Sequence, residues 1–342
     1  MKRVITAIVF ALLFLPQVVL SQDTVPTVRL KFDTRFDFTA KVPMQDSLST
    51  LSSFDGKYLN IILDGEINDK FSYNYRQRMI LDSKPTYQSF FNATDYLYLT
   101  YKINRNFSVA GGKQIVAIGG FEYDEAPIDI YFWSNFWNNV TCYQIGGSLN
   151  YKTSDDKHTI GFQIVNSPFT TESLQGIYAY NLIWHGNFDG FNTIYSLNRI
   201  EVEKAEYINY ITLGNKFSIN KLSVEVDLMD RFSDNQTNLF SDYSIIGKFK
   251  YSLNNKLSLH VKAGYDQNKS QEPTDLFIYD RYVIPGTEHA FYGAGVEYYP
   301  INDSRDLRIH AVWTSNNNTL QYQTFNIGVR WQMNISKKKV TQ

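Results

Sequence analysis

The sequence predicts an all-β protein: a sixteen-stranded antiparallel β-barrel that spans a membrane. From residue 28 to residue 40, apolar side chains alternate with charged or polar ones, and Thr34 is the exception on the apolar face. Because successive side chains of a strand point to opposite faces, this segment has one apolar and one charged face. The pattern recurs along nearly the whole chain, between turn residues. A polar inside with an apolar outside is typical of a transmembrane barrel.

The start of the chain predicts a secretory signal peptide over residues 1–21, followed by the barrel over residues 22–342. Lys2 and Arg3 form a positive first part, and the apolar run of residues 4–15 is too short to cross a bilayer as a helix. The alternative is an N-terminal membrane anchor, which needs roughly 18 or more apolar residues. We therefore expect an exported chain.

The alternating segments are sixteen in number, and an even number is the rule for bacterial single-chain barrels. The strands are expected at residues 28–40, 57–66, 71–81, 96–103, 107–116, 142–152, 158–166, 178–186, 191–200, 207–217, 221–232, 243–253, 256–266, 289–299, 307–314 and 322–333.

The links between these strands fall into two alternating classes. Short links, rich in Asn, Asp and Gly, suit tight turns and lie at residues 68–70, 104–106, 153–157, 187–190, 220, 254–255 and 301–306. Longer links lie at residues 41–56, 82–95, 117–141, 167–177, 233–242 and 267–288. Transmembrane barrels keep periplasmic turns short and extracellular loops long. With an even strand count, both chain ends lie on the short-turn side.

Strict alternation assigns the charged side chains of the strands to the lumen. A charge that faces lipid at the bilayer midplane costs about 2–4 kcal/mol, so many charges on one face must point inward. The basic residues expected to line the pore are Arg29, Lys31, Arg35, Arg76, Arg78, Lys248, Lys250, Lys262, Arg308 and Arg330. Inward acids are expected at Asp33, Asp37, Asp64, Glu66, Glu225, Asp227 and Asp266. A large soluble β-protein with a solvated face is the alternative, but it explains neither the leader nor the two classes of link.

The link at residues 117–141 is the segment expected to set selectivity. The Gly119-Gly120 pair lets the backbone pass close to the wall. Burial of an aromatic cluster is expected to hold it there: Phe132, Trp133, Phe136 and Trp137. Residues 115–140 contain no Lys or Arg. The charged residues assigned to this loop and its base are Lys113, Glu122, Asp124, Glu125 and Asp129.

Short motifs follow one another in order through most of the chain: Gly112-Lys113-Gln114, Gly119 to Tyr123, Pro127, Asp129, Tyr131, Cys142-Tyr143-Gln144, Asn166 to Phe169 and Leu213-Gly214-Asn215. This series resembles the phosphate-selective porin O and P family. The resemblance implies a sixteen-stranded trimeric porin of the bacterial outer membrane, either general or anion-preferring, with an inward-folded constriction loop at residues 117–141. It also implies basic residues around the constriction, which here would have to come from the wall.

Composition excludes several other classes. The formal net charge of −1 falls to −3 once Lys2 and Arg3 are removed with the leader, which argues against nucleic acid as a partner. Cys142 is the single cysteine, so an internal disulfide or a cysteine metal cluster is ruled out. We expect Cys142 to be a packed or lumenal residue, with a reactive thiol as the alternative. No cofactor, metal or catalytic residue is expected.

An enzyme would need a constellation that the sequence does not supply. The five histidines are scattered, with no two at metal-ligand spacing on one element. The best catalytic candidate is His260, expected on the lumen face near Ser258 and Asp266, and a hydrogen-bonded wall histidine is the plainer interpretation. A lipase-like or protease-like barrel is therefore one alternative, and a plugged adhesion or scaffold barrel is another.

The leading hypothesis is a passive diffusion channel for small hydrophilic solutes or inorganic anions. Outer-membrane lipid would surround it, and three copies would form a homotrimer by resemblance. The pore diameter and the sign of charge at the narrowest point would determine selectivity. Rows of Arg and Lys opposite the acids of the inward loop would create a transverse electric field across the lumen.

Overall fold

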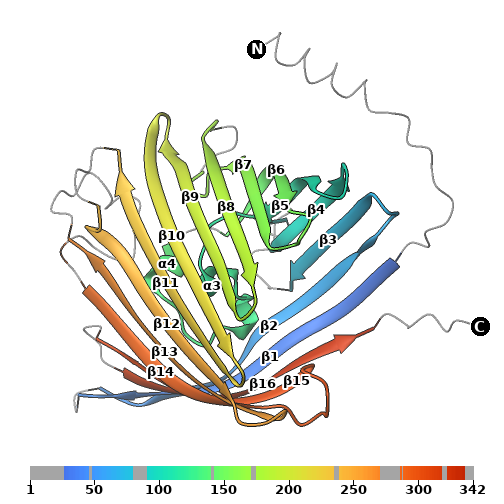
Figure 1. Ribbon diagram of the computed structural model, residues 1–342. Helices are drawn as coiled ribbons and strands as arrows, with labels where there is room; N and C mark the ends of the chain where they lie inside the picture. Colours follow the sequence, from blue (N-terminus) through green and yellow to red (C-terminus); the bar gives the residue numbers. More distant parts are fainter. Residues whose placement is uncertain are drawn as a thin grey trace, which may run out of the picture.

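A closed antiparallel barrel of sixteen strands forms the molecule (Figure 1). The computed structural model describes residues 27–45, 48–79, 91–139, 142–170, 175–234, 239–269, 286, 288–317 and 322–335. The predicted signal peptide lies outside the described residues. The strands are β1 (Thr27–Pro43), β2 (Leu51–Glu66), β3 (Phe71–Arg78), β4 (Thr94–Lys102), β5 (Phe107–Ile115), β6 (Tyr143–Lys152), β7 (His158–Asn166), β8 (Tyr178–Phe188), β9 (Phe191–Glu203), β10 (Glu206–Ile219), β11 (Leu222–Ser233), β12 (Asp242–Ser252), β13 (Leu257–Asn268), β14 (Glu288–Tyr298), β15 (Leu307–Asn316) and β16 (Tyr322–Asn334).

Each strand pairs with its neighbours in sequence, and β16 closes the ring on β1. The closing register pairs Lys31 with Asn334, so the first and last strands meet at the rim where the chain enters and leaves. Closure leaves no unpaired strand edge, which lipid could not satisfy. The predicted fold class is confirmed.

The two faces of the wall follow the predicted alternation. Phe249 and Val261 are cross-strand partners on the outer face, and each is more than half exposed to the surroundings. Lys248 precedes Phe249 and Lys262 follows Val261, and these two lysines are partners on the inner face. Since the side-chain period of a strand is two, one apolar partner pair fixes the inward direction of its charged neighbours.

The strands extend further than predicted at the rim of the longer links. β2 begins at Leu51, six residues earlier than expected, and pairs with a β1 that continues to Pro43. In sequence this stretch resembles a loop, because it contains Ser52, Ser53 and Gly56. Its backbone pairing with β1 nevertheless maintains it as a strand. β9 and β10 approach within two residues of each other, and Ala205 takes a φ of 66° in the tight turn.

One asparagine motif recurs in the short turns. The side-chain oxygen of Asn68 accepts hydrogen bonds from the backbone N–H groups of Lys70 and Phe71, both at 2.9 Å. Asn104 and Asn254 make the corresponding pairs of bonds in the β4–β5 and β12–β13 turns. The asparagine thus satisfies two backbone donors that the tight turn leaves without a ladder partner.

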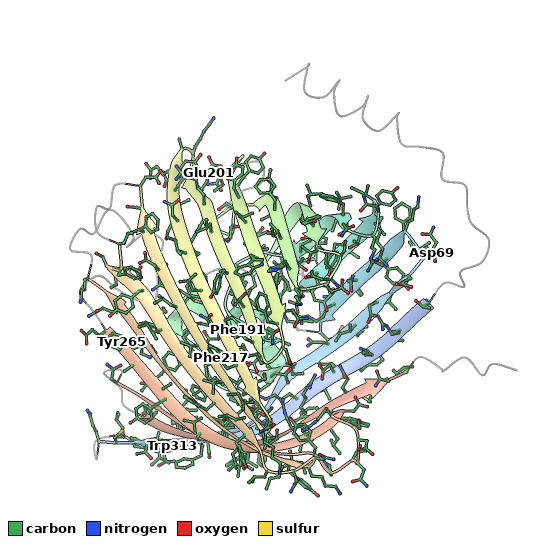
Figure 2. All side chains as sticks on the ribbon, in the orientation of Figure 1. Asp69, Phe191, Glu201, Phe217, Tyr265 and Trp313 are labelled. Atoms are coloured by element: carbon green, nitrogen blue, oxygen red, sulfur yellow. The ribbon has the colours of Figure 1, made fainter. Side chains whose placement is uncertain are left out.

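Aromatic pairs mark both ends of the wall. Next to the short turns, ring centroids lie 4.8 to 4.9 Å apart in the pairs Phe71–Tyr101, Phe107–Tyr151 and Phe191–Phe217. Figure 2 shows Phe191 and Phe217 far down the wall from Glu201, which lies near the opposite rim. At that rim, Phe38 contacts Phe54 and Tyr292 contacts Trp313. Aromatic belts of this kind sit at the two membrane–water interfaces.

The lumen is not polar throughout, contrary to the simple alternation rule. Ile200, Ile208, Ile246 and Phe291 occupy inward positions and are nearly fully buried. They form one apolar cluster with side chains of the link between β5 and β6. That link therefore fills part of the barrel with a hydrophobic core. Within the described residues, no helix has the length and apolar character needed to cross a bilayer.

Replacing Asn68 with Ala should lower the free energy of unfolding by roughly 0.5–2 kcal/mol, since two turn hydrogen bonds are lost. The measurement is a urea titration of the refolded barrel in micelles. Asp69→Ala is the matched control, because the Asp69 side chain is exposed at the tip of the same turn. An Asn68→Ala stability equal to that of Asp69→Ala would show that the asparagine bonds contribute nothing.

Candidate functional site

The β5–β6 loop crosses the lumen to the far wall. It contains α3 (Phe121–Asp124), the 3-10 helix η1 (Pro127–Asp129) and α4 (Asn135–Asn139). The Gly119 N–H donates to Ser196 Oγ on β9 at 2.8 Å. Further along, the Arg35 guanidinium of β1 donates to the carbonyls of Ile128 and Ile130. Figure 1 shows α3 and α4 inside the ring of strands, as these contacts require. The loop folds inward, as predicted.

The loop begins with a backbone contact that only glycine permits. Gly120 has a φ of 98°, and a Cβ atom there would lie 2.7 Å from Met229 Cε. This conformation aims the N–H groups of Phe121 and Glu122 at the two carboxylate oxygens of Asp227, at 2.9 and 2.8 Å. Asp227 on β11 therefore fixes the start of α3.

Three of the four loop acids bind bases on the wall. Glu122 lies 2.5 Å from Lys262 on β13, and both side chains are buried. Glu125 lies 2.6 Å from Lys248 on β12. Burial raises the pKa of the Glu125 carboxyl, and the Lys248 ammonium opposes that effect. The acids of the loop and the bases of this wall are therefore in direct contact instead of facing each other across an open lumen.

Asp129 completes the set through two bases. Its carboxylate lies 2.8 Å from Arg308 on β15 and 3.3 Å from Arg330 on β16. Asp124 is the exception, since its side chain is exposed on the other side of the loop. One acid of the loop therefore faces open space, and three anchor it.

Aromatic packing holds the second half of the loop. Phe136 is 1% exposed, with its ring between those of Tyr123 and Tyr210. Trp133 stacks on Trp137 at a centroid distance of 5.1 Å. The expectation that aromatic burial fixes the loop against the wall agrees with these contacts. Burying a large aromatic side chain contributes several kcal/mol.

A cavity of about 240 Å³ lies between the loop and this wall. Glu297 lines it and accepts hydrogen bonds from Tyr131, Lys250 and Tyr299. Tyr131 in turn stacks on His260 at 5.3 Å. The charged residues that line the cavity are Glu125, Asp129, Lys248, Lys250, Lys262, Glu297, Arg308 and Arg330. We call it the charged cavity.

The remaining predicted wall bases lie elsewhere. Arg76 and Arg78 on β3 share the buried carboxylate of Asp95, at 2.6 and 2.5 Å. Arg35 is buried against Asp37 beneath the loop. These three bases sit at register positions on the inner face, as strict alternation predicts.

Three predicted bases lie apart from the loop. Arg29 is exposed near the short-turn rim and pairs with Asp64, and Lys31 on β1 is half-buried. Lys113 on β5 donates to the carbonyl of Phe91 at 2.9 Å, with its ammonium above the Phe91 ring. Its register partner is Leu97, an exposed outer-face residue. Lys113 thus contacts the segment before β4 instead of the constriction acids with which it was grouped.

Two acids that bind the wall bases escaped the sequence analysis. Asp95 falls in the predicted link at residues 82–95, but a register shift between Arg76 and Gln77 leaves it unpaired in the ladder, and its carboxylate binds Arg76 and Arg78. The sequence could have identified Glu297 as inward. It lies two and four residues after Gly295 and Gly293, which pair with the inward residues His260 and Lys262.

The catalytic alternative is not assembled by the described residues. Asp266 accepts hydrogen bonds from Ser244 and the backbone of Asn135, and it contacts His289. His260 instead stacks on Tyr131, and its Nε2 atom has no hydrogen-bond partner in this part of the chain. The described residues likewise contain no group of three potential metal ligands.

The model of the family described as phosphate-selective porin O and P matches residues 28–194. This match confirms the predicted family. The fold and the family together place the protein in the bacterial outer membrane as a porin channel. The matched residues contain β1 to β8 and the whole β5–β6 loop.

Several solved porin-like structures share the fold at low sequence identity. An anion-selective porin from Comamonas acidovorans aligns with a TM-score of 0.64 and 9% identity over 90% of this chain and 100% of its own. OmpT of Vibrio cholerae in a trimer form gives 0.63 and 12% over 91% and 100%. Salmonella typhi OmpF gives 0.59 and 13% over 90% and 97%. Among curated protein sequences, none matches the chain.

Replacing Glu122 with Gln should lower the free energy of unfolding by roughly 3–5 kcal/mol, because it leaves the buried Lys262 ammonium without its counter-charge. Urea unfolding in micelles measures the loss. The control is Asp124→Asn in the same short helix, whose exposed acid should be replaceable within about 0.5 kcal/mol. Equal stabilities of the two variants would refute the anchoring role of the ion pair.

Proposed function

We propose that this porin is a passive diffusion channel for small hydrophilic solutes with a modest preference for anions, inorganic phosphate among them. The family name and the likeness to an anion-selective porin are consistent with that preference. The observation that carries it is the orientation of the ion pairs on the wall, in which bases face the lumen and acids lie behind them.

Three of the wall pairs illustrate this orientation. The Lys250 side chain is 36% exposed and its partner Glu297 only 5%. Arg78 is 33% exposed, against 2% for Asp95. Lys216 is also more exposed than Glu225. A solute in the lumen therefore meets the ammonium or guanidinium before the carboxylate, and because it lies closer to the positive charge, an anion is attracted more strongly than it is repelled.

The preference is modest because other pairs are balanced or have the opposite orientation. Lys248 and Glu125 are about equally exposed, and Asp129 is more exposed than Arg308. Exposed charges in a water-filled pore are also screened over about 8 Å at physiological ionic strength. The channel is therefore expected to favour anions without excluding cations or neutral solutes.

The assembly we propose is a homotrimer in outer-membrane lipid. A porin fold of this kind occurs in a trimer form in OmpT of Vibrio cholerae. The exposed apolar outer face suits lipid and protein neighbours alike. Chemical cross-linking of the refolded protein should yield a three-chain product.

We further propose that the channel has no enzymatic activity. The family and the fold favour transport, and the contacts of Asp266 and His260 give no relay of the kind that a hydrolase requires. The plugged-barrel alternative differs in predicting no conductance.

The test is the reversal potential of the refolded protein in a planar bilayer under a salt gradient. The wild type should conduct with anion preference. In Arg78→Gln/Lys250→Gln the anion-to-cation permeability ratio should fall at least about twofold, since each exposed charge contributes roughly 0.2–1 kcal/mol.

Lys157→Gln/Lys221→Gln is the matched control, because it removes the same charge from residues in the short turns. Its permeability ratio should stay at the wild-type value. Cation preference in the wild type, or equal ratios in the two double variants, would contradict the assignment of anion preference to the wall bases. An inserted barrel that does not conduct would contradict the channel itself.

A further inference from the structure

A second cavity lies on the other side of the loop, and its chemistry differs from that of the charged cavity. It has a volume of about 350 Å³ and lies between the first half of the loop and the wall formed by β4 to β8. The wall residues that line it include Tyr98, Thr100, Ala110, Gln114, Ser148, Asn150, Gly161, Gln163, Ile183 and His185. We call it the neutral cavity.

Charge distinguishes the two cavities. Eight charged side chains line the charged cavity, whereas Asp124 is the one carboxylate that lines the neutral cavity, with His185 beside it and no Lys or Arg. The remaining lining groups are hydroxyls, side-chain amides, tyrosine rings and aliphatic side chains. An ion gains little here from opposite charges, so the lining suits an uncharged polar solute.

Two amides in this lining are already fixed by the protein. Gln163 accepts from the Ala117 N–H at 2.8 Å and donates to the Ile115 carbonyl at 2.8 Å. Gln114 accepts from Ser148 and donates to the Gly146 carbonyl. These bonds stiffen the wall, as a preformed binding site requires.

Three other polar side chains line the same cavity without such hydrogen bonds: Thr100, Asn150 and His185. Within the described residues, no hydrogen bond engages their side chains, and all three are only half-buried. A hydroxyl, an amide and an imidazole between them supply donors and acceptors at three points. Polar groups at several points of an otherwise uncharged wall suit a solute with several hydroxyl groups.

Small residues create the room. Ala110, Ser148 and Gly161 lie opposite the loop, and a Cβ atom on Gly161 would sit 2.7 Å from Asn150 Oδ1 and 3.0 Å from Ile183 Cγ2. Tyr98 adds an aromatic side chain to the same wall. Aromatic rings offer a flat apolar surface to C–H groups, while the polar groups around them fix orientation.

The position of the loop makes this cavity part of the route. Its acids contact β12, β13, β15 and β16, and its aromatic side chains pack in a cluster with residues of β7 to β12 and β14. The space that this packing leaves beside the loop includes the neutral cavity, against β4 to β8. A solute that passes the loop on this side therefore passes along the neutral cavity.

We propose that the neutral cavity is a retention site for uncharged, hydroxyl-rich solutes of the size of a mono- or disaccharide. Their hydroxyl groups hydrogen-bond to Thr100, Asn150 and His185, and a C–H face packs against Tyr98. The inference rests on the proposed channel function and adds a second solute class to the anions favoured by the wall bases.

The test is the ion current of the reconstituted full-length protein in the presence of glucose or maltose. Retention predicts a saturable fall in single-channel conductance with sugar concentration. In Thr100→Val/Asn150→Ala the half-blocking concentration should rise about tenfold, since two hydrogen-bonding groups are removed. Polyethylene glycol of similar size is the control solute and should lower the conductance without saturation in both proteins.

Lys250→Gln is the matched control variant, because it changes the charged cavity and should leave the sugar block unchanged. Tyr98→Leu replaces the double variant if the latter does not insert, and it should also weaken the block. A conducting wild type without saturable block, or a block unaffected by the lining substitutions, overturns the retention site while the channel function stands. An inserted protein without any current overturns the channel function first.

Discussion

The ion pairs between the β5–β6 loop and the basic wall are the interaction on which the rest of the site depends. Glu122, Glu125 and Asp129 bind Lys262, Lys248 and the Arg308–Arg330 pair. Without these bases the loop acids would be buried uncompensated, and without the loop the bases would repel one another. Aromatic packing around Phe136 adds an apolar anchor. The lumen is consequently divided, with one side filled by the loop and the other open.

That division separates two kinds of chemistry. On the filled side, charges are numerous but mostly paired. A passing ion is therefore attracted only weakly, by pairs in which the base is more exposed than its acid. On the open side, the wall of β4 to β8 is nearly free of charge and carries amides, hydroxyls and small residues. A single loop can therefore support weak anion preference and passage of neutral solutes in one barrel, because it determines which wall a solute touches.

Much of the fold could be predicted from the sequence because a barrel wall obeys a simple period of two. The alternation from residue 28 onward, the even strand count and the two link classes led to the architecture that the structure confirms. The site was less predictable, because it depends on contacts between distant segments. Periodicity identified Lys248 and Lys262 as inward but could not show which loop acids they bind. Ile246 and Phe291 lie inward and are covered by the loop, which the alternation of polar and apolar residues gives no sign of, and a register shift concealed Asp95.

The most direct test of the divided lumen is the accessibility of single introduced cysteines to a water-soluble methanethiosulfonate reagent in the open channel. Asn150→Cys, on the open wall, should react and reduce the current as the reagent enters the path. Ile246→Cys, also inward but beneath the loop, should not react, like the wild type with Cys142 alone. Rapid reaction and current loss at Ile246→Cys, with Asn150→Cys unreactive, would contradict the account, because solutes would then pass on the side that the loop fills.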